Sequence, residues 1–147
     1  MPSARKFFTA EQQQQIVHAI SHAESHTSGE IRVHLEDRCQ ADPVQRATAV
    51  FEKLGMHQTA LRNGILIYLA VKDHQFAIIG DAGIHEKVSD TFWTDVRDRM
   101  LEHFREHRFA DGLCAAVQEA GRQLKTYFPR ADDDIDEMTN EISFPDA

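Results

Sequence analysis

The stretch "GILIYLAVKDHQFAIIGDAG", residues 64–83, decides the fold of this chain. Its first part, residues 64–71, is apolar throughout, which is typical of a strand covered on both faces. Residues 72–75 are polar and predict a turn, and the apolar run 76–80 predicts a second strand. The two strands therefore form an antiparallel hairpin inside a sheet that carries helices on both faces.

The residues before this hairpin predict a helix, a strand and a second helix. Thr9-Ala-Glu-Gln12 fits a capping box, and the helix that it starts should stop at Ser28-Gly29. The strict alternation in "EIRVHLE", residues 30–36, predicts a half-buried strand with its apolar side chains on one face. Asp42-Pro43 is typical of a helix start, and Gly55 is typical of the end of that helix.

Two further helices are predicted after the hairpin, at about residues 89–107 and 111–128. A strand–helix–strand crossover makes the first two strands parallel, and the hairpin makes the third strand antiparallel to the second. The sequence therefore predicts an α/β protein, a three-layer α/β/α sandwich around a small mixed sheet. We expect one domain over residues 1–128, followed by an acidic tail over 129–147.

The charge of the chain is distributed unevenly. The net charge is −8, but residues 131–147 hold seven Asp and Glu and no Lys or Arg, which leaves residues 1–130 at −1. Without a basic face the long-range attraction to nucleic acid is missing, so a nucleic-acid partner is not expected. The tail is expected to be mobile, or to dock on the surface through Ile142 and Phe144.

Hydropathy and cysteine usage bear on the compartment. No run approaches the roughly 18 consecutive apolar residues of a membrane-spanning helix, so no membrane span is expected. Cys39 and Cys114 lie far apart in the sequence without a CxxC pairing, which suits a reducing compartment. A cytoplasmic location is the resulting expectation.

The predicted topology brings polar residues to one edge of the sheet. The first residues of the two parallel strands and the last residue of the antiparallel strand meet there, and the next helix starts close by. Carboxylate and amide oxygens are the ligands that Ca²⁺ and Mg²⁺ prefer, so the sequence predicts a divalent-cation site at this edge. Its candidate ligands are Glu30, Asn63, Asp81 and Asp90. An alternative stays open, in which Glu30 and Asp81 pair with Arg62 and Asp90 caps a helix.

Histidines offer two weaker metal motifs. The run "HFREH", residues 103–107, matches the inverted zinc-protease signature H-x-x-E-H, but it falls at the polar end of an amphipathic helix. His18, His22 and His26 form a stripe at four-residue spacing on the first predicted helix, and two histidines so spaced can chelate Zn²⁺ or Ni²⁺. A solvated helix face is the favoured interpretation of this stripe.

Four segments in this order suggest a family. "SGEIRVHLE", "RNGILIYLAVKDHQFAIIGDAGI", "VSD" and "RFADGL" resemble the TPM domain, and the resemblance covers roughly residues 8–128. That family includes a thylakoid-lumen protein of photosystem II repair that is described as an acid phosphatase. The resemblance implies a Rossmann-like α/β/α domain that binds divalent metal, calcium in particular, in some members and has weak phosphatase activity in others.

The chain departs from the family pattern near the expected site. Gly83, Ile84 and Asp90 match it. Arg62 stands where family members usually carry an acidic residue, and His85 stands where they carry a glutamate. Asp81 is in a position to compensate for the missing carboxylates.

Two functional hypotheses of different class follow. The first is a non-enzymatic domain that binds a divalent cation or a protein partner through the predicted strand-edge site. The second is a weak metal-dependent phosphatase for phosphomonoesters, with a Ca²⁺ or Mg²⁺ cofactor against a phosphate oxygen and Arg62 as the anion clamp. No nucleophile stands out, so the binding domain is the favoured hypothesis.

Overall fold

The structure is a computed structural model of the 147-residue chain, and it describes residues 3–130 and 139–145. Short helices add to the elements expected from the sequence. In chain order the elements are α1 (Ala4–Phe7), α2 (Ala10–Glu24), β1 (Glu30–Glu36), α3 (Pro43–Lys53), the 3₁₀ helix η1 (Met56–Gln58), β2 (Gly64–Ala70), β3 (Gln75–Gly80), α4 (Ala82–Lys87), α5 (Asp90–Phe104) and α6 (Phe109–Tyr127).

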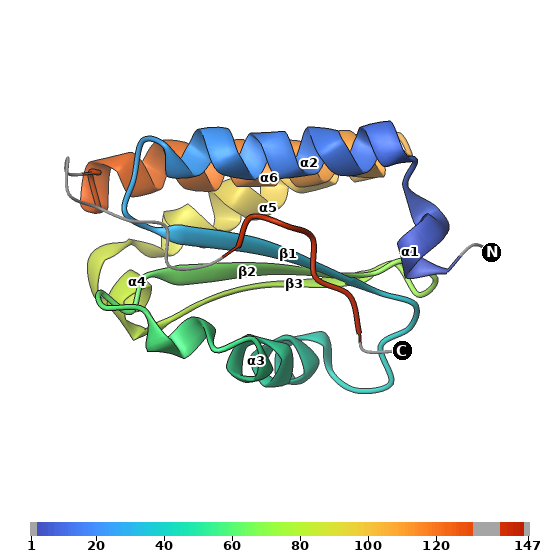
Figure 1. Cartoon of the computed structure of the whole chain (residues 1–147), viewed down its shortest axis with the longest axis horizontal. Coiled ribbons are helices and arrows are strands. Elements are labelled where there is room, and N and C mark those ends of the chain that lie inside the picture. Colours follow the sequence, from blue (N-terminus) through green and yellow to red (C-terminus); the bar gives the residue numbers. More distant parts are fainter. Residues whose placement is uncertain (1–2, 131–138, 146–147) are drawn as a thin grey trace.

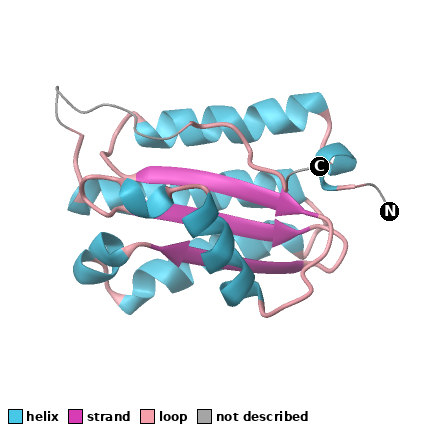
Figure 2. Cartoon of the chain, turned by 60° about the horizontal axis from the view of Figure 1, so that its bottom comes forward, coloured by secondary structure: helices cyan, strands magenta, loops and turns pink. Residues whose placement is uncertain are grey.

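The three strands form one mixed sheet in the order β1-β2-β3. β1 pairs with β2 in parallel, and β2 pairs with β3 in antiparallel orientation, so two arrows point one way and the third points back in Figure 2. β2, the apolar strand of the opening stretch, is buried along its whole length. The predicted mixed sheet is therefore confirmed, with β2 at its centre.

Helices cover both faces of the sheet. α2, α5 and α6 lie on one face and α3 lies on the other, as Figure 1 shows. The larger core cluster fills the space under α2, α5 and α6, and a smaller cluster around Phe51, Met56 and Tyr68 lies under α3. The predicted three-layer α/β/α sandwich is confirmed. Within the described residues, no helix is long and apolar enough to span a bilayer.

The helix-start signals in the sequence work as predicted. The Thr9 hydroxyl accepts from the Gln12 N–H at 3.1 Å, and the Gln12 side chain accepts from the Thr9 N–H at 3.0 Å, which completes the capping box of α2. The Asp42 carboxylate accepts from two backbone N–H groups at the start of α3. These caps satisfy backbone donors that the first helical turn cannot satisfy itself.

The predicted end of the first helix is wrong by four residues. α2 ends at Glu24, and not at Ser28-Gly29. The chain leaves the helix early because Thr27 turns inward, where its buried hydroxyl contacts the carbonyl of Phe128 at the end of α6. A tertiary contact between segments far apart in sequence thus overrides the local glycine signal.

The prediction of a half-buried β1 is also wrong. All seven of its residues are buried, including Arg32, His34 and Glu36 on the polar face. That face is covered by α3 and by residues 139–145 near the C-terminus, which lie beside β1 in Figure 1. Docking of the tail through Ile142 and Phe144 is therefore confirmed, whereas the rest of the predicted acidic tail, 131–138 and 146–147, lies outside the described residues.

Candidate functional site

The strand ends converge as the topology predicts. The Asp81 N–H donates to the carbonyl of Gly64 at 3.0 Å, and the Glu30 N–H donates to the carbonyl of Asn63 at 3.3 Å. The start of β1, the start of β2 and the end of β3 thus lie at one end of the sheet. We call this the strand-end site.

Asp81 forms a two-pronged ion pair with Arg62 in this site. The Arg62 Nε lies 2.6 Å from Asp81 Oδ2, and its terminal nitrogen lies 2.7 Å from Oδ1. Asp81 Oδ1 also accepts the Ala82 N–H at 2.8 Å, so Asp81 is the N-cap of α4, a short helix that the sequence reasoning missed. Burial raises the pKa of the Asp81 carboxyl, but these hydrogen bonds outweigh it and hold that pKa below its usual range.

Arg62, which pairs with Asp81, has an unusual backbone conformation. Its φ of 52° lies in the left-handed region, which a residue with a Cβ adopts at some energetic cost. The Asp81 carboxylate is 7% exposed, whereas the Arg62 side chain is 50% exposed. One partner is therefore fixed inside the protein, and the other reaches it from the surface.

Gly83, two residues after Asp81, lies where only a glycine fits. A Cβ at residue 83 would lie 2.2 Å from the Leu61 carbonyl oxygen and 2.6 Å from that of Arg62, so a side chain has no room. The Gly83 N–H instead donates to the Arg62 carbonyl at 2.8 Å. This close approach attaches the start of α4 to the loop that carries Arg62, which aligns the ion pair.

The other predicted ligands are placed differently. Glu30 is buried at the start of β1, and Asn63 is buried and donates from its amide to the Ser28 hydroxyl at 3.3 Å. Asp90 lies exposed at the first position of α5, where Ser89 is the N-cap. The alternative interpretation is thus confirmed for the pair of Asp81 with Arg62, while Asp90 starts its helix instead of capping it.

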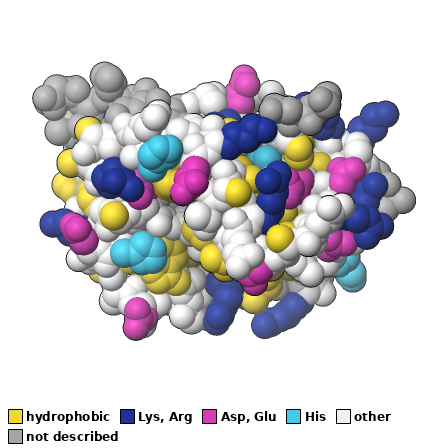
Figure 3. Space-filling model, turned by 90° about the horizontal axis from the view of Figure 1, so that it is seen from below, with side chains coloured by type: hydrophobic (Ala, Val, Ile, Leu, Met, Phe, Trp, Pro, Cys, Tyr) yellow, Lys and Arg dark blue, Asp and Glu magenta, His cyan; other side chains and the backbone are white. Residues whose placement is uncertain are grey.

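A cavity of about 680 Å³ opens beside the ion pair, between α3, β3 and α5. Its polar lining comes from Thr48, Glu52, His57, Arg62, Asp81 and His85. Trp93 stacks on the His85 ring with 5.0 Å between the ring centroids. Apolar residues of α3 and β3 complete the lining. Figure 3, seen from the α3 side, shows hydrophobic side chains exposed among basic and acidic ones.

The sequence analysis missed His57 and Trp93 as cavity residues. The place of Trp93 in the cavity depends on how α5 crosses the end of β3. His57 lies in η1, between the elements that the hydrophobic periodicity indicated. Only the position of His85 in the family pattern gave a signal for this part of the lining.

The donor groups of the strand-end site decide whether it can hold a metal ion. In the described part of the chain, no three His, Cys, Asp or Glu side chains are grouped so as to hold a metal. Both oxygens of Asp81 are already engaged by Arg62. As arranged here, the residues do not fit a hard cation, and a cation at Asp81 would have to replace the Arg62 guanidinium.

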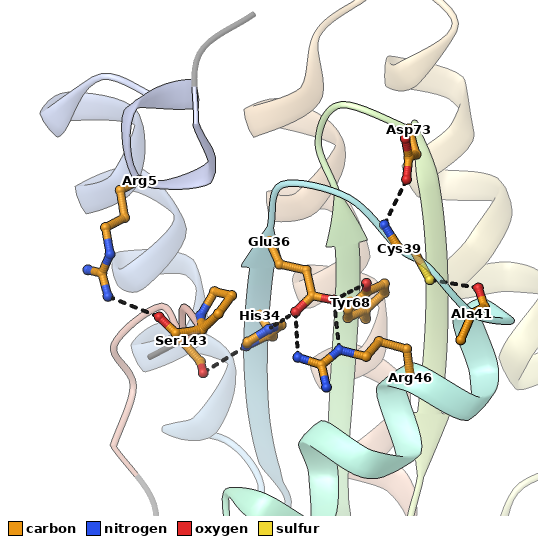
Figure 4. A network of polar contacts seen from close by, with 10 residues as sticks. Arg5, His34, Glu36, Cys39, Ala41, Arg46, Tyr68, Asp73 and Ser143 are labelled. Carbon is orange, nitrogen blue, oxygen red and sulfur yellow. Dashed lines mark hydrogen bonds and ion pairs between the residues drawn. The ribbon is translucent and has the colours of Figure 1, made fainter. Parts of the chain in front are cut away.

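A second polar cluster, which the sequence analysis missed, lies at the other end of the sheet (Figure 4). The Glu36 carboxylate receives two hydrogen bonds from Arg46, both 2.8 Å, and one from the hydroxyl of Tyr68. The His34 Nε2 lies 3.1 Å from Glu36, and its Nδ1 lies 2.9 Å from the Ser143 hydroxyl. The alternation of β1 placed His34 and Glu36 on one face, but nothing local indicated that the face is buried.

The environment of this cluster shifts the pKa values of Glu36 and His34. Burial raises the pKa of the Glu36 carboxyl, but the hydrogen bonds from Arg46, Tyr68 and His34 together lower it to about 2. Burial lowers the pKa of His34, and the hydrogen bond to Glu36 only partly offsets this. Glu36 is therefore ionised and His34 neutral at pH 7.

The order Ser143–His34–Glu36 has the residue types of a hydrolase relay, but the N–H of Ser143 is not available as an oxyanion donor. Ser143 is 6% exposed, and its own N–H is already donated to the carbonyl of Val33 at 2.8 Å. A cavity of about 270 Å³ lies beside His34 and Ser143, between α3 and residues 143–145. The contacts of the cluster join β1, β2, α3 and residues 139–145, which supports a structural role.

The fold and the strand-end site define a class of protein. Its members are small α/β/α domains with an open polar cavity at one end of the sheet. The sequence profile of the TPM domain matches residues 3–123. The chain belongs to the TPM domain family. The solution structure of the BA42 protein from the psychrophilic bacterium Bizionia argentinensis is similar over its whole length, with 47% identity and a TM-score of 0.92, covering 99% of this chain and 100% of that one.

Two more distant structures share the fold alone. The N-terminal domain of the cg2496 protein from Corynebacterium glutamicum is 15% identical, with a TM-score of 0.65 over 80% of this chain and 74% of that one. The N-terminal domain of a P. gingivalis protein is 18% identical, with a TM-score of 0.68 over 84% of this chain and 80% of that one. A comparison with curated proteins gave no match.

Proposed function

We propose that this TPM domain is a non-enzymatic binding domain whose ligand site is the strand-end site. The observation that carries the proposal is the two-pronged pair of Arg62 with Asp81 at the wall of the 680 Å³ cavity. The pair joins a buried carboxylate to a half-exposed guanidinium, so one partner can turn away without uncovering the core. Such a pair is suited to exchange with a ligand.

The chemistry of the pair selects between two kinds of ligand. A divalent cation binds Asp81 only if it displaces Arg62, since both groups compete for the same oxygens. An anionic group of a protein partner binds Arg62 from the cavity side, where His57 and His85 add hydrogen-bonding groups. The cation and the anion therefore act at the two ends of one ion pair.

Arg62→Gln tests the cation part of the proposal. Removing the guanidinium leaves the Asp81 carboxylate available, so Ca²⁺ or Mg²⁺ should bind this variant more tightly than it binds wild type. Asp81→Asn should abolish the binding. The measurement is calorimetric titration of each metal into the three proteins, with amide chemical shifts of residues 80–83 recorded to locate the ion.

Arg97→Gln is the matched control, because Arg97 is also a half-exposed arginine paired with an aspartate, in this case Asp98 on α5. It should bind metal as wild type does. Folded Arg62→Gln that binds neither metal, or Asp81→Asn that binds as well as Arg62→Gln does, would contradict the cation part of the proposal.

The phosphatase alternative has less support. Among the residues that line the cavity, the hydroxyl of Thr48 is the candidate nucleophile, and it is donated to the carbonyl of Val44 at 2.8 Å. We keep a cytoplasmic location within the proposal, and the free thiols of Cys39 and Cys114 support it. Hydrolysis of a generic phosphomonoester that saturates and is lost in Asp81→Asn would favour the phosphatase instead.

A further inference from the structure

Residues 139–145 lie along the outer edge of β1 and pair with it at one isolated bridge. Ser143 forms a parallel bridge with His34. The Leu35 N–H donates to the Ser143 carbonyl at 2.9 Å, and the Ser143 N–H donates to the Val33 carbonyl at 2.8 Å. The main chain of β1 therefore offers an outward-facing donor and acceptor that an extended segment satisfies.

Side chains of this segment alternate between two faces. Ile142 and Phe144 pack against the larger core cluster, on the face of the sheet that carries α2. Ser143 points the opposite way, toward His34. The edge of β1 thus accommodates an apolar residue, a small hydroxyl residue and an aromatic residue in succession.

The N-terminal region contributes to the same groove. The Arg5 guanidinium lies 4.7 Å from the centre of the Phe144 ring, and its terminal nitrogen lies 3.4 Å from the Pro145 carbonyl oxygen. A cation over an aromatic ring stabilises the ring position. Arg5 therefore closes the far end of the groove over the aromatic side chain.

His34 is held ready to recognise the hydroxyl. Its Nε2 lies 3.1 Å from Glu36, so an Nε2–H donated to this carboxylate leaves Nδ1 as an acceptor for a hydroxyl proton. Arg46 on α3 and Tyr68 on β2 fix Glu36. None of these anchors belongs to residues 139–145, so the recognition group stays in place when the segment leaves.

We propose that the edge of β1 is a binding groove for an extended peptide of another protein, which pairs in parallel and places a Ser or Thr opposite His34 between an apolar and an aromatic residue. Residues 141–145 occupy this groove in cis and act as a competitor. Addition of a strand to an exposed edge is a common mode of peptide recognition, in which main-chain hydrogen bonds supply affinity and side-chain positions supply selectivity. A partner must out-compete a segment whose tether gives it a high effective concentration, so the groove is filled until a partner with further contacts arrives.

The test uses the full chain with Ser143→Pro, which removes both the N–H that Val33 accepts and the hydroxyl that His34 accepts. The probe is a synthetic peptide of residues 139–145, Thr-Asn-Glu-Ile-Ser-Phe-Pro. It should bind Ser143→Pro, and wild type should bind it at least about tenfold more weakly because the cis segment competes. A peptide with Ala in place of its Ser should bind about fivefold more weakly, and a scrambled peptide should not bind.

Amide hydrogen exchange of Leu35 reports occupancy directly. The Leu35 N–H should be protected in wild type, exchange faster in Ser143→Pro and become protected again when the peptide is added. The amides of β2 should stay protected throughout, which shows that Ser143→Pro is folded.

Three outcomes would overturn the proposal. One is a folded Ser143→Pro with a fast Leu35 amide that binds no peptide, and another is equal binding of the scrambled peptide. The third is a wild-type dimer that grows with concentration and is lost in Ser143→Pro, because it would assign the groove to a second copy of this chain.

Discussion

Two arginine–carboxylate pairs lie at opposite ends of the same sheet, and they differ in what surrounds them. Asp81 is held by Arg62 and by the start of its own helix. Glu36 is held by three residues from three different segments, with Arg46 on α3, Tyr68 on β2 and His34 on β1. The Asp81 carboxylate therefore has one donor besides its arginine, whereas the Glu36 carboxylate has two.

We expect the number of independent supports to matter more for stability than the geometry of the pair. Both pairs are two-pronged with distances of 2.6 to 2.8 Å. Loss of Arg62 leaves Asp81 with one backbone donor, whereas loss of Arg46 leaves Glu36 with two side-chain donors. We expect the stability of the protein to depend on the Glu36 cluster, and ligand binding to depend on the Asp81 pair.

The largest expected effect is that of Glu36→Ala. The change leaves a buried phenol, a buried imidazole and a guanidinium without their acceptor, so the free energy of unfolding should fall by about 3 kcal/mol. Urea unfolding measures it, and Glu102→Ala, at an exposed position of α5, should show almost no loss. A loss for Glu36→Ala no larger than this control would break the comparison.

The same residue should dominate the acid sensitivity of the fold. Because the pKa of Glu36 is lowered from 4.5 to about 2, its stabilisation is complete above pH 4.5 and is lost as the pH falls toward 2. Wild type and Glu36→Ala should therefore approach each other in stability over this range. A difference that stays constant down to pH 2 would show that Glu36 acts through packing alone.

Gly83→Ala should have the next largest effect. The new methyl group would lie against the carbonyl oxygens of Leu61 and Arg62, so backbone must shift, at a cost of about 1–3 kcal/mol. The shift should also separate Arg62 from Asp81, which the amide shifts of residues 80–83 would report. Unchanged stability would mean that this end of the sheet is softer than the close approach indicates.

Tyr68→Phe removes one support of Glu36 and keeps the ring. The loss in the free energy of unfolding should be about 1 kcal/mol, the net value of an ordinary intramolecular hydrogen bond, because the Glu36 carboxylate keeps its other donors. The pKa of Glu36 should rise, because one hydrogen bond that lowers it is gone. Acid unfolding of this variant at a higher pH than wild type would confirm the sign.

Asp81→Asn should have the smallest effect on stability, below that of Tyr68→Phe. Asn keeps an oxygen for the Ala82 N–H, and the lost partner Arg62 is half exposed, where ion pairs contribute little. Thermal unfolding at pH 7 measures the difference. A loss as large as that of Glu36→Ala would show that the two ends of the sheet are built alike.

The sequence predicted the polar residues at one end of the sheet but not the Glu36 cluster at the other end. The difference has a physical reason. The alternation of β1 and the order of the strands placed Asp81, Arg62, Glu30 and Asn63 together, because topology alone fixes where strand ends meet. The Glu36 cluster depends on Ser143, more than a hundred residues after His34 in the chain. No periodicity within a strand or helix reports such a contact.

Side-chain roles were harder to predict than their positions. Asp81 was expected among the ligands of a cation, and its pairing with Arg62 stood as the alternative, since both follow from the same convergence. The choice between them depends on the left-handed backbone of Arg62, which turns the guanidinium toward Asp81. A non-glycine residue in that conformation is not apparent from composition or hydropathy.

Residues 139–145, which cover the outer edge of β1, also affect how the protein folds during synthesis. β1 and β2 leave the ribosome long before residues 139–145 do, so the sheet can form while the outer edge of β1 is still open to water. A translation product that ends early keeps that edge, together with the hydroxyl-accepting side of His34, and open edges pair with other chains. The arrival of residues 139–145 thus decides whether a newly made molecule associates with its neighbours or closes on itself.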